Sequence, residues 1–171
     1  MTVSVLTAPA GMVVFAFTMV YAGLTDVTTM KIRNRLVVPF FLAYVVLAPL
    51  AGFSLAEIGW SFAVAAGVLV LAFGCFAVGW IGGGDAKLLA VTALWFGADH
   101  TAAYLLVTAL LGGAFTLGVL LFRMQALPAW LPDGSWIARL HAEQAGVPYG
   151  VAMALAGLVV FPATPWMIAM P

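Results

Sequence analysis

Two aspartates are the residues of this sequence best placed to do acid–base chemistry. Asp26 closes the first apolar segment in YAGLTDVTTMKIRNRL, and Asp85 closes the third in GWIGGGDAKLL. Two carboxylates held close together share a proton, so one can take a proton from water while the other polarises a carbonyl. The pair therefore predicts an aspartyl-type hydrolase. The glycines before Asp85 would let a chain in extended form approach it without a side-chain clash.

A simpler interpretation exists for each aspartate alone, because an aspartate at a helix end is often only a cap or an interfacial charge. A divalent-metal site is a further alternative for two carboxylates. It needs more ligands, and no third carboxylate or histidine lies on a nearby apolar segment. We therefore expect neither a metal ion nor a cofactor at this pair.

The composition shows what surrounds these aspartates. Of 171 residues, 65% are hydrophobic and 7% are charged, whereas a soluble domain has about 25% charged residues. This predicts an integral membrane protein in contact with lipid. The formal net charge is zero, which gives no reason to expect nucleic acid as a partner. The first 25 residues contain no Lys or Arg, so they lack the basic start of a cleaved signal peptide and predict a retained span.

The apolar segments predict an all-α fold, a single six-transmembrane-helix bundle over residues 1–171. A helix needs about 20 apolar residues to cross the bilayer core. The polar stretch between the last two segments predicts a short interfacial helix over 135–145. The six candidate spans are 8–25, 36–54, 58–81, 86–98, 101–122 and 149–169.

The fourth span is short, since 13 residues make only about 20 Å of helix. Either its outer end dips into the membrane, or residues 82–85 lie below the cytoplasmic surface. Irregular backbone at that depth is tolerated only where protein or a water-filled cavity satisfies it. The glycine run therefore predicts a polar cavity that faces the cytoplasm.

The basic residues predict the orientation. All six fall after an odd-numbered span, and the positive-inside rule makes that side cytoplasmic. Both chain termini are then outside, and both aspartates reach the cytoplasmic end of the bundle. The basic residues are Lys31, Arg33, Arg35, Lys87, Arg123 and Arg139.

Three motifs in order resemble one family over nearly the whole chain. GGGDAKLL resembles the Gly-x-Gly-Asp signature of membrane aspartyl proteases, specifically the type IV prepilin peptidases. DVTTMKIRNRL resembles that family's other catalytic segment, with Arg33 where the family usually has proline. GVPYGVAMALAGL resembles the start of its last span. The signature alone is less specific, because presenilin-type and signal-peptide-peptidase-type proteases also carry it.

The resemblance implies an aspartic-type endopeptidase of the prokaryotic cytoplasmic (inner) membrane. Family members remove the short leader from pilin precursors on the cytoplasmic side, just before the pilin's hydrophobic helix and usually after a glycine. The implied partner is thus a pilin precursor with a hydrophobic N-terminal helix and a basic leader. Asp26 and Asp85 match the catalytic pair.

Four further residues are candidates for support of that pair. Gly82 and Gly84 belong to the glycine signature. Lys87 could pair with Asp85 or with an acid on the substrate, or serve only as a membrane anchor. Asn34 could hydrogen-bond near Asp26, or be only a turn residue.

The long bifunctional members of the family carry a zinc domain with four cysteines and also methylate the new amino terminus. Cys75 is the single cysteine here, so we expect neither a zinc nor a methyltransferase domain. The compact size resembles the minimal peptidases of tight-adherence (Flp-type) pilus systems.

Two other functions compete with proteolysis. A small proton- or cation-coupled transporter subunit could use the same two aspartates, since acids within membranes mark ion pathways. Such proteins often place these acids near the midplane and show inverted repeats. Here both acids lie at one end and no repeat is visible. A degenerate peptidase that only assists assembly is the other alternative, and the intact aspartates argue against it.

Overall fold

The computed structural model describes residues 2–128, 130–132, 134–142 and 145–168, and every regular element in these ranges is a helix. The all-helical prediction is therefore confirmed for the described residues. In chain order the elements are α1 (Thr2–Thr29), α2 (Asn34–Leu50), α3 (Leu55–Ala77), α4 (Gly83–Arg123), α5 (Trp136–His141), α6 (Tyr149–Val160), the 3-10 helix η1 (Phe161–Ala163) and α7 (Pro165–Ile168).

Among the described residues, three helices are long and apolar enough to cross a membrane: Thr7–Thr29 of α1, α3 and α4. Two shorter apolar helices, α2 and the segment Tyr149–Ala163, accompany them. Large apolar side chains cover the outside of the bundle, and Phe17, Val70 and Phe73 are each more than 60% exposed. Such a surface is expected where lipid replaces water as solvent. The structure thus fits a multi-pass membrane protein, while the count of six spans stays a prediction.

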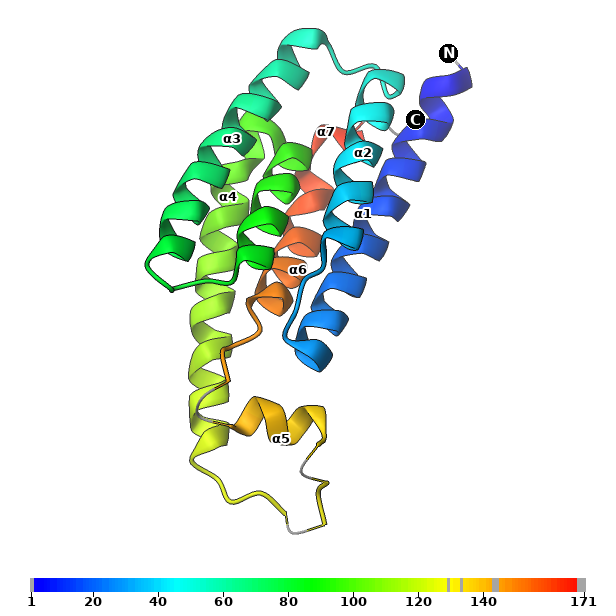
Figure 1. Ribbon diagram of the computed structural model, residues 1–171. Coiled ribbons are helices and arrows are strands. Elements are labelled where there is room, and N and C mark those ends of the chain that lie inside the picture. Colours follow the sequence, from blue (N-terminus) through cyan, green and yellow to red (C-terminus); the bar gives the residue numbers. More distant parts are fainter. Residues whose placement is uncertain (1, 129, 133, 143–144, 169–171) are drawn as a thin grey trace.

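The helix α4 contains a reversal of the chain at Gly97, which has φ 63° and ψ −166°. The limb before Gly97 and the limb after it run in opposite directions (Figure 1). The Thr101 hydroxyl donates to the Ala93 carbonyl at 3.1 Å and closes the turn. A straight helix of 41 residues would be about 60 Å long, twice the thickness of the bilayer core. The break lies close to the predicted boundary between the fourth span, which ends at 98, and the fifth span, which begins at 101. The part of α4 before Gly97 is short, as the sequence predicts for the fourth span.

Replacing Gly97 with alanine should destabilise the fold, because its backbone conformation is one that essentially only glycine adopts. We expect a loss of about 1–3 kcal/mol in the free energy of unfolding. Thermal unfolding of the detergent-solubilised protein would measure it. Gly113→Ala is the matched control, since Gly113 lies within the same helix and a Cβ there meets nothing within 4 Å. Equal melting temperatures for the two variants would contradict the prediction.

Aromatic side chains fix the relative positions of the helices that carry the two aspartates. Phe15 of α1 stacks on Phe161 with ring centroids 3.9 Å apart, and Phe40 of α2 stacks on Trp95 of α4 at 5.0 Å. The Trp95 indole also donates to the Phe40 carbonyl, and the Trp166 indole donates to the Trp95 carbonyl. Each aromatic pair contributes about 0.5–1.5 kcal/mol beyond its buried area. The cluster therefore holds α1, α2, the first limb of α4 and the C-terminal helices in one rigid arrangement.

The prediction that Asp85 closes the third span is wrong. The helix α3 ends at Ala77, and Asp85 lies in the first turn of α4, which begins at Gly83. Gly82 has extended backbone at the N-cap position, and its N–H donates to the Asp85 carboxylate three residues later. This is half of a capping box and marks the start of a helix. The end of α1 and the start of α4 nevertheless lie at the same end of the bundle (Figure 1).

Candidate active site

Asp26 lies in the last turn of α1, where its side chain is only 4% exposed. The backbone N–H of Gly150 donates to Asp26 Oδ2 at 2.7 Å. Gly150 is the second residue of α6, where a helix leaves its N–H groups without intrahelical partners. A carboxylate is also favoured there by the helix dipole. The start of α6 therefore holds the Asp26 carboxylate in one orientation.

Gly150 is a site residue that the sequence analysis did not single out. A Cβ at this position would lie 2.7 Å from Asp26 Oδ2 and 2.9 Å from Asp26 Cβ. These distances are too short for any real side chain, so the close approach of α6 to Asp26 requires glycine. The signal was present in the Pro-Tyr-Gly sequence at the start of the last span, but hydropathy gave it no role.

Asp85 is half-buried in the first turn of α4. The Gly82 N–H donates to Asp85 Oδ2 at 3.2 Å. Each aspartate therefore has one oxygen bound by a backbone N–H, while no described residue hydrogen-bonds the other oxygen. Asp85 does cap its helix, as the simpler interpretation supposed, and it still has an oxygen free for a water or a substrate.

The fold places the two aspartates at one end of the bundle on different helices, with Asp26 in the last turn of α1 and Asp85 in the first turn of α4 (Figure 1). Two carboxylates that approach each other share one proton most easily, which leaves one acid and one base. Within the described residues no group of three histidine, cysteine, aspartate or glutamate side chains is placed to hold a metal ion. Two carboxylates at the same end of the bundle are candidates for acid–base chemistry.

Because Gly84 has no side chain, the backbone of the loop that follows α1 can pack against the start of α4. A Cβ on Gly84 would lie 2.6 Å from the Ile32 carbonyl oxygen and 3.1 Å from Ile32 Cβ. At Gly84 an extended segment of this protein itself therefore packs against the glycine run. A hydrogen bond of 3.2 Å from Lys87 Nζ to Asn34 Oδ1 joins the same two segments. The described contacts of Lys87 and Asn34 therefore tie α4 to the start of α2, and neither residue bonds to Asp26 or Asp85.

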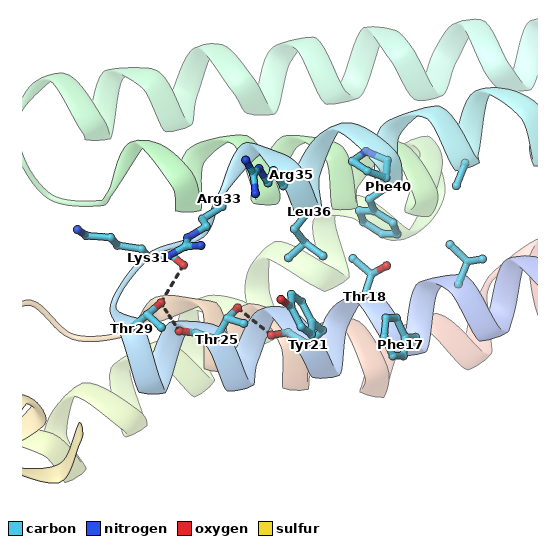
Figure 2. Close-up of a pocket in the computed structure, with 13 residues that line it drawn as sticks. Phe17, Thr18, Tyr21, Thr25, Thr29, Lys31, Arg33, Arg35, Leu36 and Phe40 are labelled. Atoms are coloured by element: carbon cyan, nitrogen blue, oxygen red, sulfur yellow. Dashed lines mark hydrogen bonds between the residues drawn. The ribbon is translucent and has the colours of Figure 1, made fainter. Parts of the chain in front are cut away.

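The polar cavity expected around residues 82–85 stays a prediction. A hollow lies between α1 and α2, and neither aspartate lines it. Figure 2 shows this hollow, with Lys31 and Arg33 at one end and Phe17 and Thr18 at the other.

Gly150→Ala should reduce any activity that depends on Asp26, because the added methyl group displaces the carboxylate from its position. A misplacement of about 1 Å can cost about 10²-fold in rate, and we expect a loss of that order. Rates of substrate cleavage in vitro, together with melting temperatures, would measure it. Gly118→Ala, where a Cβ meets nothing within 4 Å, should behave like the wild-type protein. Full activity of the Gly150 variant would show that its close contact with Asp26 is unimportant.

Comparison with known proteins adds an independent line of evidence. The type IV leader peptidase family matches residues 13–117, a range that contains both aspartates. The chain is also 33% identical over 153 residues to the prepilin leader peptidase/N-methyltransferase of Bacillus subtilis (strain 168). That match covers 84% of this chain and 60% of the relative, so this chain spans less than two thirds of the relative's length. No solved structure gives a significant match.

Proposed function

This chain belongs to the type IV leader peptidase family, and on that basis we propose that it is an aspartic-type endopeptidase in which Asp26 and Asp85 form the catalytic pair. The observation that carries the proposal is the placement of the end of α1, which carries Asp26, and the start of α4, which carries Asp85, at the same end of the bundle (Figure 1). The two aspartates come from two helices that a cluster of buried aromatic side chains fixes in place.

The proposed reaction uses the two aspartates in complementary roles. The ionised carboxylate takes a proton from a water molecule, and the resulting hydroxide attacks the carbonyl carbon of the peptide bond. The protonated carboxyl donates a hydrogen bond to the carbonyl oxygen and stabilises the charge that develops on it. As the C–N bond of the tetrahedral intermediate breaks, the proton taken from water passes to the leaving amine. The backbone N–H groups of Gly82 and Gly150 hold the carboxylates in position for these steps.

We further propose that the substrate is the precursor of a type IV pilin, of the Flp type, and that the protein removes its leader peptide. Support comes from the Bacillus relative, a prepilin leader peptidase/N-methyltransferase. The resemblance to minimal tight-adherence peptidases favours the Flp type. Gly82 supports the site through its N–H, which donates to the Asp85 carboxylate. Gly84 supports it by its contact with Ile32, and Lys87 and Asn34 support it by the hydrogen bond between α4 and the start of α2.

The proposed location is the inner membrane of a prokaryote, with the aspartates at the cytoplasmic face and both termini outside. The distribution of basic residues supports this orientation. Lys31 and Arg33 follow α1, Lys87 lies in the first turns of α4, and Arg123 ends α4. These segments all lie at the end of the bundle that holds the aspartates (Figure 1).

A transporter subunit fits the structure less well. Asp26 is in the last turn of α1 and Asp85 in the first turn of α4, whereas transport sites for coupled ions lie near the membrane midplane.

Cleavage in membrane vesicles of defined orientation would test substrate and orientation together. Inside-out vesicles that contain the protein should remove the leader from an added Flp-type pilin precursor, and sealed right-side-out vesicles should not. Mass spectrometry of the product would locate the cut before the hydrophobic helix. If the protein cleaves another type IV pilin precursor but no Flp-type precursor, the proposed peptidase activity stands and the Flp-type substrate is rejected. Failure with every precursor would reject the proposed activity.

A further inference from the structure

A groove between α1 and α2 combines an apolar end with a cationic end. Its volume is about 710 Å³. The cationic end carries Lys31, Arg33 and Arg35, and no aspartate or glutamate lines the groove. Figure 2 shows the labelled basic and threonine side chains along it, with the aromatic residues at the far end. The remaining lining residues are Val14, Phe17, Thr18, Tyr21, Thr25, Thr29, Leu36, Pro39, Phe40 and Ala43.

The cations reach this groove because the connection after α1 is extended. Arg33 has φ −88° and ψ 147°, and alternate side chains of an extended segment point to opposite sides. Ile32 is buried and packs over Gly84, whereas Lys31 and Arg33 are exposed and line the groove. One side of this segment therefore contacts the candidate active site, and its other side forms the cationic end of the groove.

Among the described residues, no acidic side chain pairs with the three cationic side chains. Across the described part of the chain, none of Lys31, Arg33 and Arg35 forms an ion pair or a side-chain hydrogen bond with the protein. Two arginines and a lysine beside one another match the oxygens of a phosphate group, which arginine can bind in a bidentate manner. The adjoining apolar end is lined by Phe17, Leu36 and other side chains that would accept a hydrocarbon chain.

We propose that this groove binds one anionic phospholipid. Its phosphate lies among Lys31, Arg33 and Arg35, and an acyl chain follows the apolar end between α1 and α2. The bound lipid holds the extended segment against Gly84 from the opposite side and so steadies the candidate active site. This proposal does not depend on the proposed protease function.

A substrate peptide is a poorer occupant of the same groove. Neither Asp26 nor Asp85 lines it, and the Asp26 carboxylate is directed toward Gly150 of α6. The neighbouring Thr25 and Thr29 line the groove instead. A peptide that filled the groove would therefore not place a bond between the two carboxylates, whereas a lipid needs only the charged end and the apolar end.

Native mass spectrometry of the purified full chain would test the proposal, with phosphatidylglycerol and phosphatidylcholine supplied at equal concentrations. The wild-type protein should retain phosphatidylglycerol in preference. Lys31→Gln, Arg33→Gln and Arg35→Gln should each weaken that retention about fivefold, the equivalent of about 1 kcal/mol per cation near an anionic lipid. Arg139→Gln is the matched control, because Arg139 is an exposed cation on α5 outside the groove, and it should retain the lipid as the wild type does.

A second variant separates a built site from general attraction to basic residues. Ala43→Trp fills the apolar end and leaves every charge in place, so it should lose the preference for phosphatidylglycerol; Val14→Trp serves if the first variant does not fold. If a folded Ala43→Trp variant retains phosphatidylglycerol as well as the wild type does, the proposal is overturned. A loss of retention in Arg139→Gln as large as in the groove variants would also overturn it. Displacement of the lipid by millimolar inorganic phosphate would assign the site to free phosphate. Displacement by a pilin precursor peptide would assign it to substrate.

Discussion

Replacing either Asp26 or Asp85 with asparagine should abolish cleavage of a pilin precursor while the protein still accumulates in the membrane. Asparagine is nearly isosteric, and its side-chain oxygen can still accept the N–H of Gly150 or Gly82 that each aspartate accepts now. It cannot take up the proton that an attacking water must lose. General acid–base catalysis alone is worth about 10²–10⁴-fold, so we expect a loss of at least that size.

The double variant should be no worse than either single one, because residues that act as a unit have non-additive effects. Asp99→Asn is the control, since Asp99 lines a different hollow with Trp60 and His100, away from both aspartates. It should keep most of the activity. The measurement is the fraction of a co-expressed precursor that is processed, compared at equal amounts of membrane-inserted enzyme. Near-normal processing by either single variant would remove the basis of the aspartyl-protease proposal and favour the transporter alternative.

Gly84→Ala should reduce kcat/KM for the precursor by about 10²-fold, which is the scale for a displacement of about 1 Å at a catalytic group. The added Cβ would lie 2.6 Å from the Ile32 carbonyl oxygen. That atom belongs to the backbone, so the whole segment after α1 must move away from α4. The movement would also strain the hydrogen bond between Lys87 and Asn34.

Gly83→Ala is the matched control for this change. Its Cβ would lie 3.3 Å from the outer edge of the Phe76 ring, and a side chain of this kind can shift by a few tenths of an ångström. We expect an effect of about twofold or less, as for substitutions away from special features. Equal rates for the two variants would show that the packing of Ile32 on Gly84 does not position the site.

The glycines of the signature therefore have different physical roles. Gly82 is the extended N-cap of α4, and its N–H binds the Asp85 carboxylate. Gly84 leaves space for the Ile32 carbonyl. The sequence predicts only that both glycines permit a chain to approach. The contact with Ile32 was not predictable, because Ile32 lies more than 50 residues before Gly84 in the sequence.

Helix boundaries were predicted well only where a change in polarity accompanies them. The span over 101–122 overlaps the second limb of α4 closely, whereas the span over 36–54 continues past the end of α2 at Leu50. The third span was extended to 81, although α3 ends at Ala77 and the chain then turns through Gly79, which has φ 78°. Val78, Trp80 and Ile81 are apolar, so a hydropathy pattern cannot distinguish this turn from helix.

The sequence by itself determined the class of protein and the candidate residues for catalysis. A chain with 7% charged residues must keep its backbone hydrogen bonds internal in lipid, which leaves helices as the spanning element for apolar segments of this length. Two aspartates at the ends of such segments then stand out. Only the tertiary structure decided what each of them contacts: Gly150 at Asp26, the turn at Gly97, Ile32 over Gly84, and the bond between Lys87 and Asn34. These are contacts between distant segments or backbone angles, and they depend on close packing of helices rather than on local polarity.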